Sequence, residues 1–316
     1  MKKIILIGFW PDYESIFFRN TQLENAVVEL INPKEMMEKY PLFRYLPRPI
    51  RNRIFRSIII KAIKANPAAI ILLQEFRLIL ETIEKYQPKI SGGVMMRNVV
   101  DESSKLYPLI QKLKANRYQF WSFDRSDCNK YGFHFYRQFV DKISLESPVT
   151  RKADFIFIGR DKGRLNWLLD FKAESEKRKF KTIIDVRSNT KIGAGNKERK
   201  GGTKTYNNYL KSQLRGRCVL DIVQKGQEGM TLRPLEALLY GQKVLTNNIS
   251  VKKLEIYHPS NIYVIEDELD FDEISHFMSQ PMSEVDNKIL SLHSTKSVLN
   301  QIMGTIQHQT TGKKNV

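Results

Sequence analysis

The chain has 316 residues, of which 41% are hydrophobic and 27% are charged, so it can bury a sizeable core and is not a wholly disordered protein. Its 52 basic and 34 acidic residues leave a formal net charge of +18, which implies an anionic partner: nucleic acid, a phosphate-bearing metabolite or an acidic membrane surface. Its two cysteines exclude a disulfide scaffold and a four-cysteine zinc site.

The first apolar segment follows Met-Lys-Lys and resembles a signal peptide only in part. The apolar run is short, and residues 11–14 follow it in place of a small-residue cleavage site. We therefore predict a buried first strand over residues 4–8. The chain has no run of about 18 apolar residues, which predicts no transmembrane helix. We expect a cytoplasmic protein, with the inner face of the cytoplasmic membrane as an alternative, peripheral location.

Through the first half of the chain, strand-like apolar runs alternate with stretches long enough for helices. After the first strand, the predicted strands of this half are 26–30, 89–94 and 118–123. This alternation is typical of βα units and a parallel sheet.

A second series of strands and helices begins at Ala153, after Ser147-Pro148. Its predicted strands are 154–158, 182–186, 218–223, 243–246 and 261–265, and its predicted helices are 166–175, 206–213 and 231–240. We therefore predict two Rossmann-like, doubly wound α/β domains, 1–150 and 151–303, that face each other across a cleft. Residues 304–316 are expected to form a disordered tail.

The most informative segment is 221–246, which predicts a strand, a loop, a helix and another strand. Gly229 allows the backbone to approach a ligand closely, and the free N–H groups of Gly229, Met230 and Thr231 would point to an anion at the helix start. Glu228 and Glu236 are separated by about two helical turns. One carboxylate can therefore contact hydroxyls before a diphosphate and the other can contact hydroxyls beyond it, which is the layout of a nucleotide sugar.

These residues carry a resemblance to a known family. Glu228-Gly229, Glu236-Ala237-Leu238, Gly241 and residues 243–246 resemble the donor site of GT-B fold glycosyltransferases. The spacing of the two glutamates is that of retaining members. Residues 227–233 and 243–248 are similar to a group of bacterial capsule and lipopolysaccharide glycosyltransferases, with support from 157–164 and 121–131. The resemblance covers mainly residues 118–265.

The resemblance implies a metal-independent hexosyltransferase that needs no cofactor and uses a nucleotide-diphosphate sugar, with a UDP-sugar as the expected donor. The acceptor would be a surface glycan or lipid-linked glycan of lipopolysaccharide, O-antigen or capsule. The first domain would bind this acceptor and the second the donor. The donor-site residues would be Gln227, Glu228, Gly229, Met230, Thr231, Arg233 and Glu236. Among these, Glu236 would bind the ribose hydroxyls, and Thr231 and Arg233 would lie near the diphosphate. The outcome, retaining or inverting, stays open, because the first glutamate is not always present in that group.

The loop that begins at Gly159 follows the first strand of the second domain. Loops at the carboxyl ends of strands face the ligand crevice in such sheets. Arg160, Lys162 and Arg164 could therefore neutralise a diphosphate leaving group. The alternative is a solvated turn in which Arg164 opens a helix.

Carboxylates for catalysis and acceptor binding are sought at the ends of strands. Asp12 follows the first strand and is the candidate catalytic base of an inverting enzyme, while Glu228 is the candidate catalytic carboxylate at the donor. Asp12 alternatively caps a helix. Asp124 and Asp127 end the fourth predicted strand and either bind the acceptor or cap a helix.

Three further patterns are not assigned a catalytic role. Asp270-Phe271-Asp272 has the spacing of metal-dependent transferases, but its acidic context is typical of a helix start, and we predict no metal site. The basic loop 191–204 either is mobile or closes over a phosphate. Residues 43–64 contain seven basic residues and no acid, which is typical of an amphipathic segment on an anionic membrane or of a core-facing helix with a basic outer face.

Two other functions compete with glycosyl transfer. A charge of +18 suffices for nonspecific nucleic-acid binding, although the basic residues are spread along the chain and no specific nucleic-acid module is visible. A sugar-nucleotide epimerase can share the same two-domain layout.

Overall fold

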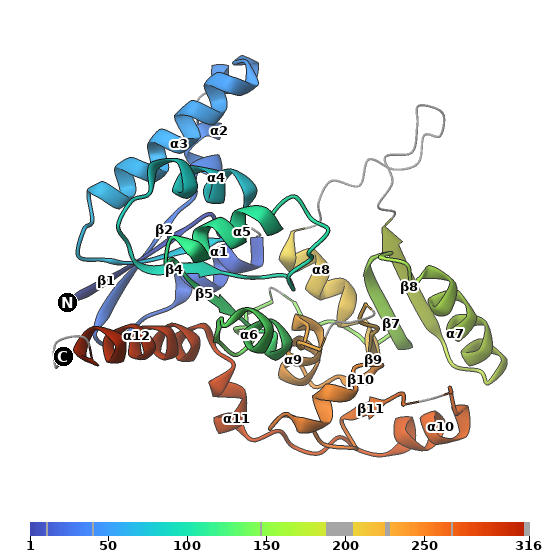
Figure 1. The fold of residues 1–316 in the computed structure, drawn as a ribbon. Coiled ribbons are helices and arrows are strands. Elements are labelled where there is room, and N and C mark those ends of the chain that lie inside the picture. The colour runs from blue at the N-terminus through green and yellow to red at the C-terminus, as the bar shows by residue number, and fades with distance from the viewer. Residues whose placement is uncertain are drawn as a thin grey trace. The chain divides into compact units, whose positions relative to one another are not determined.

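The computed structural model describes residues 1–10, 12–39, 41–145, 147–187, 205–224, 228–266 and 268–312. They belong to two compact units, and each unit is described by itself. Unit 1 is Met1–Arg137 together with Thr295–Val316, and unit 2 is Gln138–Ser294. Within the described residues each unit has one sheet, and every strand pair in both sheets is parallel. The predicted class of two Rossmann-like α/β domains is confirmed (Figure 1).

In unit 1 the described strands are ordered β2-β1-β3-β4-β5-β6. They are β1 (Lys2–Ile7), β2 (Ala26–Ile31), β3 (Ile70–Gln74), β4 (Ser91–Met95), β5 (Gln119–Ser122) and β6 (His134–Phe135). The helices between them are α1 (Asp12–Asn20), α2 (Pro33–Glu38), the 3-10 helix η1 (Pro41–Tyr45), α3 (Arg48–Lys64), α4 (Arg77–Tyr86), α5 (Tyr107–Ala115) and α6 (Arg125–Tyr131).

The central strands of unit 1 are apolar on both faces because helices cover both faces of a parallel sheet. Residues 4–7 of β1 are fully buried. The strand ends where Gly8 adopts a φ of 91°, a left-handed conformation that favours glycine. In β4, a Cβ on Gly92 would lie 2.2 Å from the carbonyl oxygen of Ile71, so only glycine allows the two strands to pair there.

The sequence analysis missed strand β3, which lies between β1 and β4 in the sheet. Its residues 70–73 are at most 7% exposed. A short apolar run of this kind cannot be distinguished from part of a buried helix by its periodicity. The pairing with β1 and β4 makes it a strand, and that pairing is set by tertiary structure.

In unit 2 the described strands are ordered β11-β10-β9-β7-β8. They are β7 (Ala153–Arg160), β8 (Thr182–Arg187), β9 (Gly216–Asp221), β10 (Lys243–Thr246) and β11 (Ile262–Val264). The helices are α7 (Leu165–Lys177), α8 (Tyr206–Gln213), α9 (Leu232–Leu239), the 3-10 helix η2 (Ile249–Lys253), α10 (Phe271–Ser279) and α11 (Asn287–Leu292). Each predicted element of the second series is found, within two residues at either end.

The division of the chain differs from the predicted boundary at residue 150, since the change of unit falls at Gln138. The predicted disordered tail is also wrong as far as Gly312, because α12 (Thr295–Gly312) is helical and belongs to unit 1. Its residues Val298, Leu299, Ile302, Met303 and Ile306 are buried. They repeat at helical spacing and therefore form one apolar face, which packs into unit 1. Gln301 Nε2 also donates to the carbonyl oxygen of Phe135 at 2.9 Å.

Within the described parts of the chain, none of the helices combines the length and the apolar character that crossing a bilayer requires.

Candidate functional site

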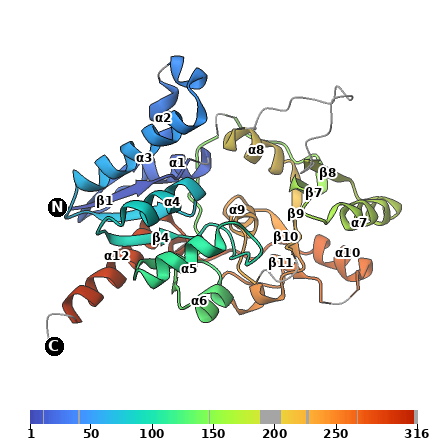
Figure 2. The ribbon, with the colours of Figure 1, turned by 45° about the horizontal axis from the view of Figure 1, so that its top comes forward.

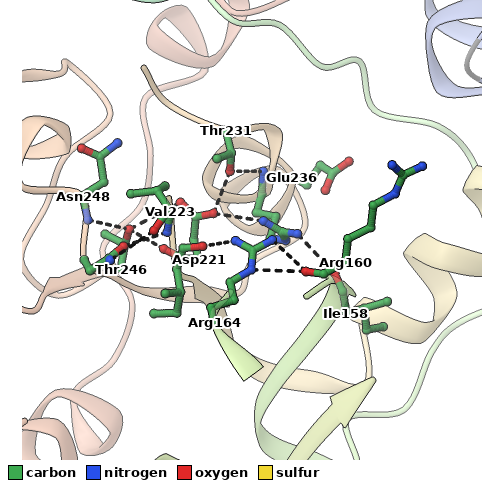
Figure 3. Close-up of polar contacts among 12 residues, drawn as sticks. Ile158, Arg160, Arg164, Asp221, Val223, Thr231, Glu236, Thr246 and Asn248 are labelled. Atoms are coloured by element: carbon green, nitrogen blue, oxygen red, sulfur yellow. Dashed lines mark hydrogen bonds and ion pairs between the residues drawn. The ribbon is translucent and has the colours of Figure 1, made fainter. Parts of the chain in front are cut away.

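The strand order of unit 2 reverses between β7 and β9. β8 lies on one side of β7 and β9 lies on the other, so connections leave this point in opposite directions. In open parallel sheets, ligands bind beyond the carboxyl ends of the strands at such a switch point. The loop after β7 and the end of β9 meet there, because the guanidinium of Arg164 donates to the carbonyl oxygen of Ile222 (Figure 3).

Asp221, the last residue of β9, is the buried carboxylate of this point and is 1% exposed. Its Oδ1 accepts from the Thr231 hydroxyl at 2.7 Å and from Arg233 Nη1 at 3.4 Å. The hydroxyl of Thr246, at the end of β10, donates to the carbonyl oxygen of Asp221 at 2.7 Å. Through its carboxylate and its backbone carbonyl, Asp221 thus joins the ends of two strands to the start of α9.

Arg233 and Arg164 lie against the same aromatic ring, with their guanidinium carbons 5.1 and 4.9 Å from the ring centroid of Phe157. Arg164 donates from Nε and Nη2 to the carbonyl oxygen of Arg160 at 3.3 and 3.2 Å. Arg233 Nη2 lies 3.4 Å from the carbonyl oxygen of Ile158. Its Nε is buried and has no hydrogen-bond partner among the described residues. We call Asp221, Arg164 and Arg233 the unit 2 cluster.

The positive charge of the unit 2 cluster is not fully compensated. Burial and the neighbouring charge of Arg233 lower the pKa of Arg164 to about 10. Desolvation and the charges of Arg164, Arg233 and Arg160 lower the pKa of Lys162. Arg160 and Lys162 are exposed. An added anion would relieve the repulsion among these four cations.

Gly159, near the end of β7, lies close to the Arg233 guanidinium. A Cβ at this position would lie 2.6 Å from Arg233 Nη2. Arg164 also precedes α7, and Asp161 Oδ1 accepts from the backbone N–H groups of Arg164 and Leu165 at 3.1 and 3.0 Å. Arg164 therefore opens a helix, as the alternative expected, but it is buried and does not belong to a solvated turn. Opening the helix does not remove the guanidinium from the switch point.

The start of α9 is capped by the Thr231 side chain, which accepts from Arg233 N at 3.3 Å. Gly229 and Met230 are buried just before it, and Glu228 is exposed. The Glu228 carbonyl oxygen accepts from the Ser250 hydroxyl at 2.5 Å and from Asn248 Nδ2 at 3.2 Å. These bonds fasten the loop to the segment that follows β10. Gln227 lies outside the described residues.

Glu236, predicted to bind ribose, is 1% exposed. Its Oε1 accepts from the Tyr206 hydroxyl at 2.8 Å, and its Oε2 accepts from the Tyr209 hydroxyl at 3.2 Å. Burial raises its pKa. Both tyrosines come from α8 and were not among the predicted site residues, although their spacing of three positions places them on one helix face. A ribose that contacts Glu236 would have to replace these hydroxyls.

Unit 1 has a second switch point, between β1 and β3. Glu14 lies in α1, just after β1. Its Oε1 accepts from Arg97 Nε at 2.5 Å, and both side chains are almost fully buried. Glu75, which follows β3, accepts at Oε1 from Asn98 Nδ2 at 2.8 Å, and its buried Oε2 has no partner among the described residues. Burial raises the pKa of Glu75 to about 7. We call Glu14, Glu75, Arg97 and Asn98 the unit 1 cluster.

Sequence reasoning missed Glu75, Arg97 and Asn98. Their signal was weak, because each follows an apolar run by one to three residues and β3 itself was not recognised. Of the two acids that follow the first strand, sequence reasoning chose Asp12 and not Glu14. A polar residue directly after each buried strand is the pattern that would have found them.

The remaining predicted carboxylates of unit 1 are engaged within the unit or lie at its surface. Asp12 is exposed in the first turn of α1 and lines a pocket of about 280 Å³ with Trp10 and Glu35. Asp124 caps α6 by accepting from Ser126 N at 2.8 Å, so its predicted alternative role as a cap is confirmed. Asp127 Oδ2 accepts from Val100 N at 3.1 Å.

Asp270 caps α10 by accepting from Asp272 N and Glu273 N at 2.8 and 3.0 Å, which confirms the predicted helix start. Across the residues that the structure describes, no group of three or more His, Cys, Asp or Glu side chains could hold a metal ion.

A cavity of about 650 Å³ lies at the amino edge of the unit 1 sheet, opposite the switch point, beside Ser91 and Gln119. Loop residues 191–204 lie outside the described residues.

No protein-family model matches the chain, and no curated protein sequence matches it. Solved structures do match. The chain is similar to a glycosyltransferase involved in avilamycin A biosynthesis, with a TM-score of 0.50 and 12% identity over 99% of each chain. It is similar to an alpha-glucosyltransferase in complex with UDP and DNA, with a TM-score of 0.53 and 11% identity over 97% of this chain and 100% of the other. It is also similar to UDP-GlcNAc 2-epimerase from Neisseria meningitidis, with a TM-score of 0.53 and 10% identity over 96% of this chain and 100% of the other.

These similarities extend over nearly the whole chain and show its fold. The two parallel-sheet units are those of the two-domain GT-B architecture. The same architecture includes nucleotide-sugar transferases and epimerases, so the fold by itself leaves the reaction to be argued from the site.

Proposed function

We propose that the chain is a glycosyltransferase that moves a sugar from a nucleotide-diphosphate sugar, with a UDP-sugar as the expected donor. The observation that carries the proposal is the unit 2 cluster. It places two guanidinium groups, one with an unpartnered buried N–H, at the β7/β9 switch point beside the start of α9. A nucleoside diphosphate supplies the anion that this arrangement lacks.

In the proposed reaction, the bond between the sugar's anomeric carbon and the diphosphate oxygen breaks, and negative charge develops on the leaving diphosphate. Overall, the anomeric carbon becomes bonded to the acceptor oxygen, and the proton of the acceptor hydroxyl passes to a base. Arg160 and Lys162 are exposed at the same loop and would contact the leaving diphosphate directly. Cations already positioned where charge develops stabilise the transition state without reorganisation. They would take the place of a required metal ion.

The other predicted site residues enter as proposals. Glu228 would contact the donor sugar, and Glu236 would meet the ribose after release of Tyr206 and Tyr209. In unit 1, Asp12 remains the candidate base for the acceptor hydroxyl. Glu75 is a second candidate, because burial raises its pKa to about 7 and a base titrating near neutral pH is suited to proton transfer.

We propose further that the acceptor is a bacterial surface glycan or lipid-linked glycan, as in lipopolysaccharide, O-antigen or capsule synthesis. This rests on the resemblance of residues 227–233 and 243–248 to enzymes of those pathways. It would place the protein in the cytoplasm or on the inner face of the cytoplasmic membrane.

The test of the donor site is a calorimetric titration of the full chain with UDP, ADP, GDP and TDP. Replacing both exposed cations (Arg160→Ala with Lys162→Ala) should weaken binding of the preferred diphosphate by about tenfold to a hundredfold, since each charged contact contributes roughly 1 kcal/mol or more. The matched control, Lys181→Ala with Lys288→Ala, removes two exposed cations away from the switch point and should leave affinity within about twofold. Absence of binding by any nucleoside diphosphate, or equal loss in the control, would overturn the donor site.

A sugar-nucleotide epimerase is the second candidate, favoured by the similarity in fold to UDP-GlcNAc 2-epimerase. Incubation with a UDP-sugar and no acceptor distinguishes the two. An epimerase converts the free donor into its isomer, whereas a glycosyltransferase leaves the sugar's configuration unchanged until an acceptor or water receives it.

A further inference from the structure

The outer face of α3 presents a row of exposed residues without a single acid. Ile50, Arg53, Ser57, Lys61 and Lys64 follow one another at intervals of three or four residues and are all exposed. The opposite face is formed by Phe55, Ile59 and Ile63, which are at most 4% exposed and pack into the core of unit 1. The spacing therefore gives α3 a buried apolar face and a cationic outer face.

An apolar end adjoins this row. Leu42 and Tyr45 of η1 are 75% and 70% exposed, Met36 of α2 is 44% exposed, and Ile50 of α3 is 46% exposed. The helix α2 packs against both η1 and α3, and Figures 1 and 2 both show α2 beside α3. Single exposed apolar side chains are ordinary, but four on three contiguous elements form a patch that indicates a partner.

The cations of this face are available to a partner. No described carboxylate pairs with Arg48, Arg53, Lys61 or Lys64, whereas Arg56, on the flank of the helix, pairs with Glu81 at 3.2 Å. An anionic surface would therefore meet unpaired charges. We call Met36, Leu42, Tyr45, Ile50, Arg53, Lys61 and Lys64 the α3 face.

We infer that the α3 face docks on an anionic lipid bilayer, with Leu42, Tyr45, Met36 and Ile50 entering the headgroup region and the row of cations lying on the lipid phosphates. A bilayer fits both halves of the face, because it offers an apolar interior and a negative surface together. Nucleic acid would match the cations but not the four exposed apolar side chains. The proposed function decides only which membrane the α3 face would bind, the inner face of the cytoplasmic membrane. Donor binding does not use this surface.

The experiment measures co-sedimentation of the full chain with vesicles of phosphatidylcholine alone and of phosphatidylcholine with phosphatidylglycerol, at low and at physiological salt. We expect binding to the anionic vesicles that weakens as salt increases. The triple variant Arg53→Glu, Lys61→Glu, Lys64→Glu should lower the partition coefficient by about a hundredfold or more, since each basic residue near such a surface contributes about a factor of five. The double variant Leu42→Ser, Tyr45→Ser should lower it by about tenfold.

The matched control is the triple variant Lys105→Glu, Lys181→Glu, Lys288→Glu, which changes the net charge equally at exposed positions elsewhere. It should keep vesicle binding within about threefold of the unmodified chain. Equal loss in this control, no loss in the α3 variants, or retention of an oligonucleotide by the α3 face with no vesicle binding would each overturn the inference. UDP binding is measured on every variant and should be unchanged. A variant that loses vesicle binding and keeps UDP binding has lost only the function of the α3 face. An unmodified chain that does not bind UDP would instead contradict the proposed function.

Discussion

The switch points of the two units have the same topology and opposite surpluses of charge. In unit 1, two buried carboxyl groups, Glu14 and Glu75, lie near one arginine, Arg97, which forms its ion pair with Glu14, while Glu75 accepts from Asn98. In unit 2, two arginines accompany one carboxylate, Asp221, which pairs with Arg233 at 3.4 Å and acts on Arg164 through its charge. Both clusters lie where a strand order reverses, so the backbone determines where a ligand binds and the side chains determine its charge.

The difference in charge changes the pKa values of the buried groups in each cluster. Burial raises the pKa of Glu75, so the unit 1 cluster holds a proton near neutral pH. Burial and repulsion lower the pKa of Arg164, so the unit 2 cluster is receptive to an anion. Under the proposed function, the unit 1 cluster would handle a proton and the unit 2 cluster would hold a phosphate.

The largest expected effect comes from removing the carboxylate of Asp221, the ionic partner of Arg233. Asp221→Ala leaves Arg233 buried without its ionic partner and should lower the free energy of unfolding by about 3–5 kcal/mol. Urea denaturation of unit 2, followed by tryptophan fluorescence, measures it. The exposed Asp170→Ala on α7 is the control and should change stability by less than about 0.5 kcal/mol. A loss below about 1 kcal/mol at position 221 would contradict the view that the cluster is tightly coupled.

The second prediction concerns pH and unit 1. Glu75 has a folded-state pKa of about 7, above the ordinary value of 4.5, so the unfolded chain loses this proton first as pH rises. Its contribution to stability is therefore present below about pH 4.5 and is lost progressively up to about pH 7, by up to roughly 3 kcal/mol. Glu75→Gln, which retains an oxygen for Asn98, should remove most of this decline.

The measurement is the free energy of unfolding of the unmodified chain and of the Glu75→Gln variant at pH 5, 6, 7 and 8. Glu84→Gln, on the surface of α4, should leave the pH dependence as it is in the unmodified chain. An identical decline in the Glu75→Gln variant would show that another group carries it.

A smaller loss of stability is expected from a substitution of Gly159, which lies close to Arg233. Gly159→Ala places a methyl group against the guanidinium, which has to move, and should cost about 1–2 kcal/mol. The same shift should weaken binding of a nucleoside diphosphate. Gly304→Ala in α12, where a Cβ meets nothing within 4 Å, should instead be neutral or stabilising by about 0.5–1 kcal/mol. Equal effects at both positions would mean that Arg233 is free to relax.

The smallest predicted effect separates capping from the bond to Asp221. Thr231→Ala removes both and should cost about 1–2 kcal/mol, whereas Thr205→Ala removes only the cap of α8 and should cost about 0.5–1 kcal/mol. Thermal unfolding of the two variants measures the difference. Indistinguishable values would show that the Thr231 hydroxyl contributes to unit 2 only as a cap.

Local patterns in the sequence were enough to predict much of the fold. Helix 206–213 and strand 243–246 were predicted at the bounds that the structure has, because their apolar spacing and flanking residues are local signals. The same kind of signal predicted that Gly159, Arg160 and Arg233 lie near one edge of the second sheet, and the structure has Gly159 beside Arg233 there. Strand β3 was missed because its four apolar residues, 70–73, are too few to show a period. The tail was misread because most of the apolar face of α12 lies before residue 304, so the tail by itself carries little of that pattern.

The sequence by itself determined the parallel α/β class, the carboxyl ends at which polar loops gather and the cationic character of α3, since all three depend on residues that are neighbours along the chain. Tertiary structure alone decided the pairings that distinguish the two switch points. Arg164 meets Ile222 across 58 positions and Glu14 meets Arg97 across 83. No spacing rule reaches such distances, because these contacts form only when strands far apart in sequence lie side by side in one sheet.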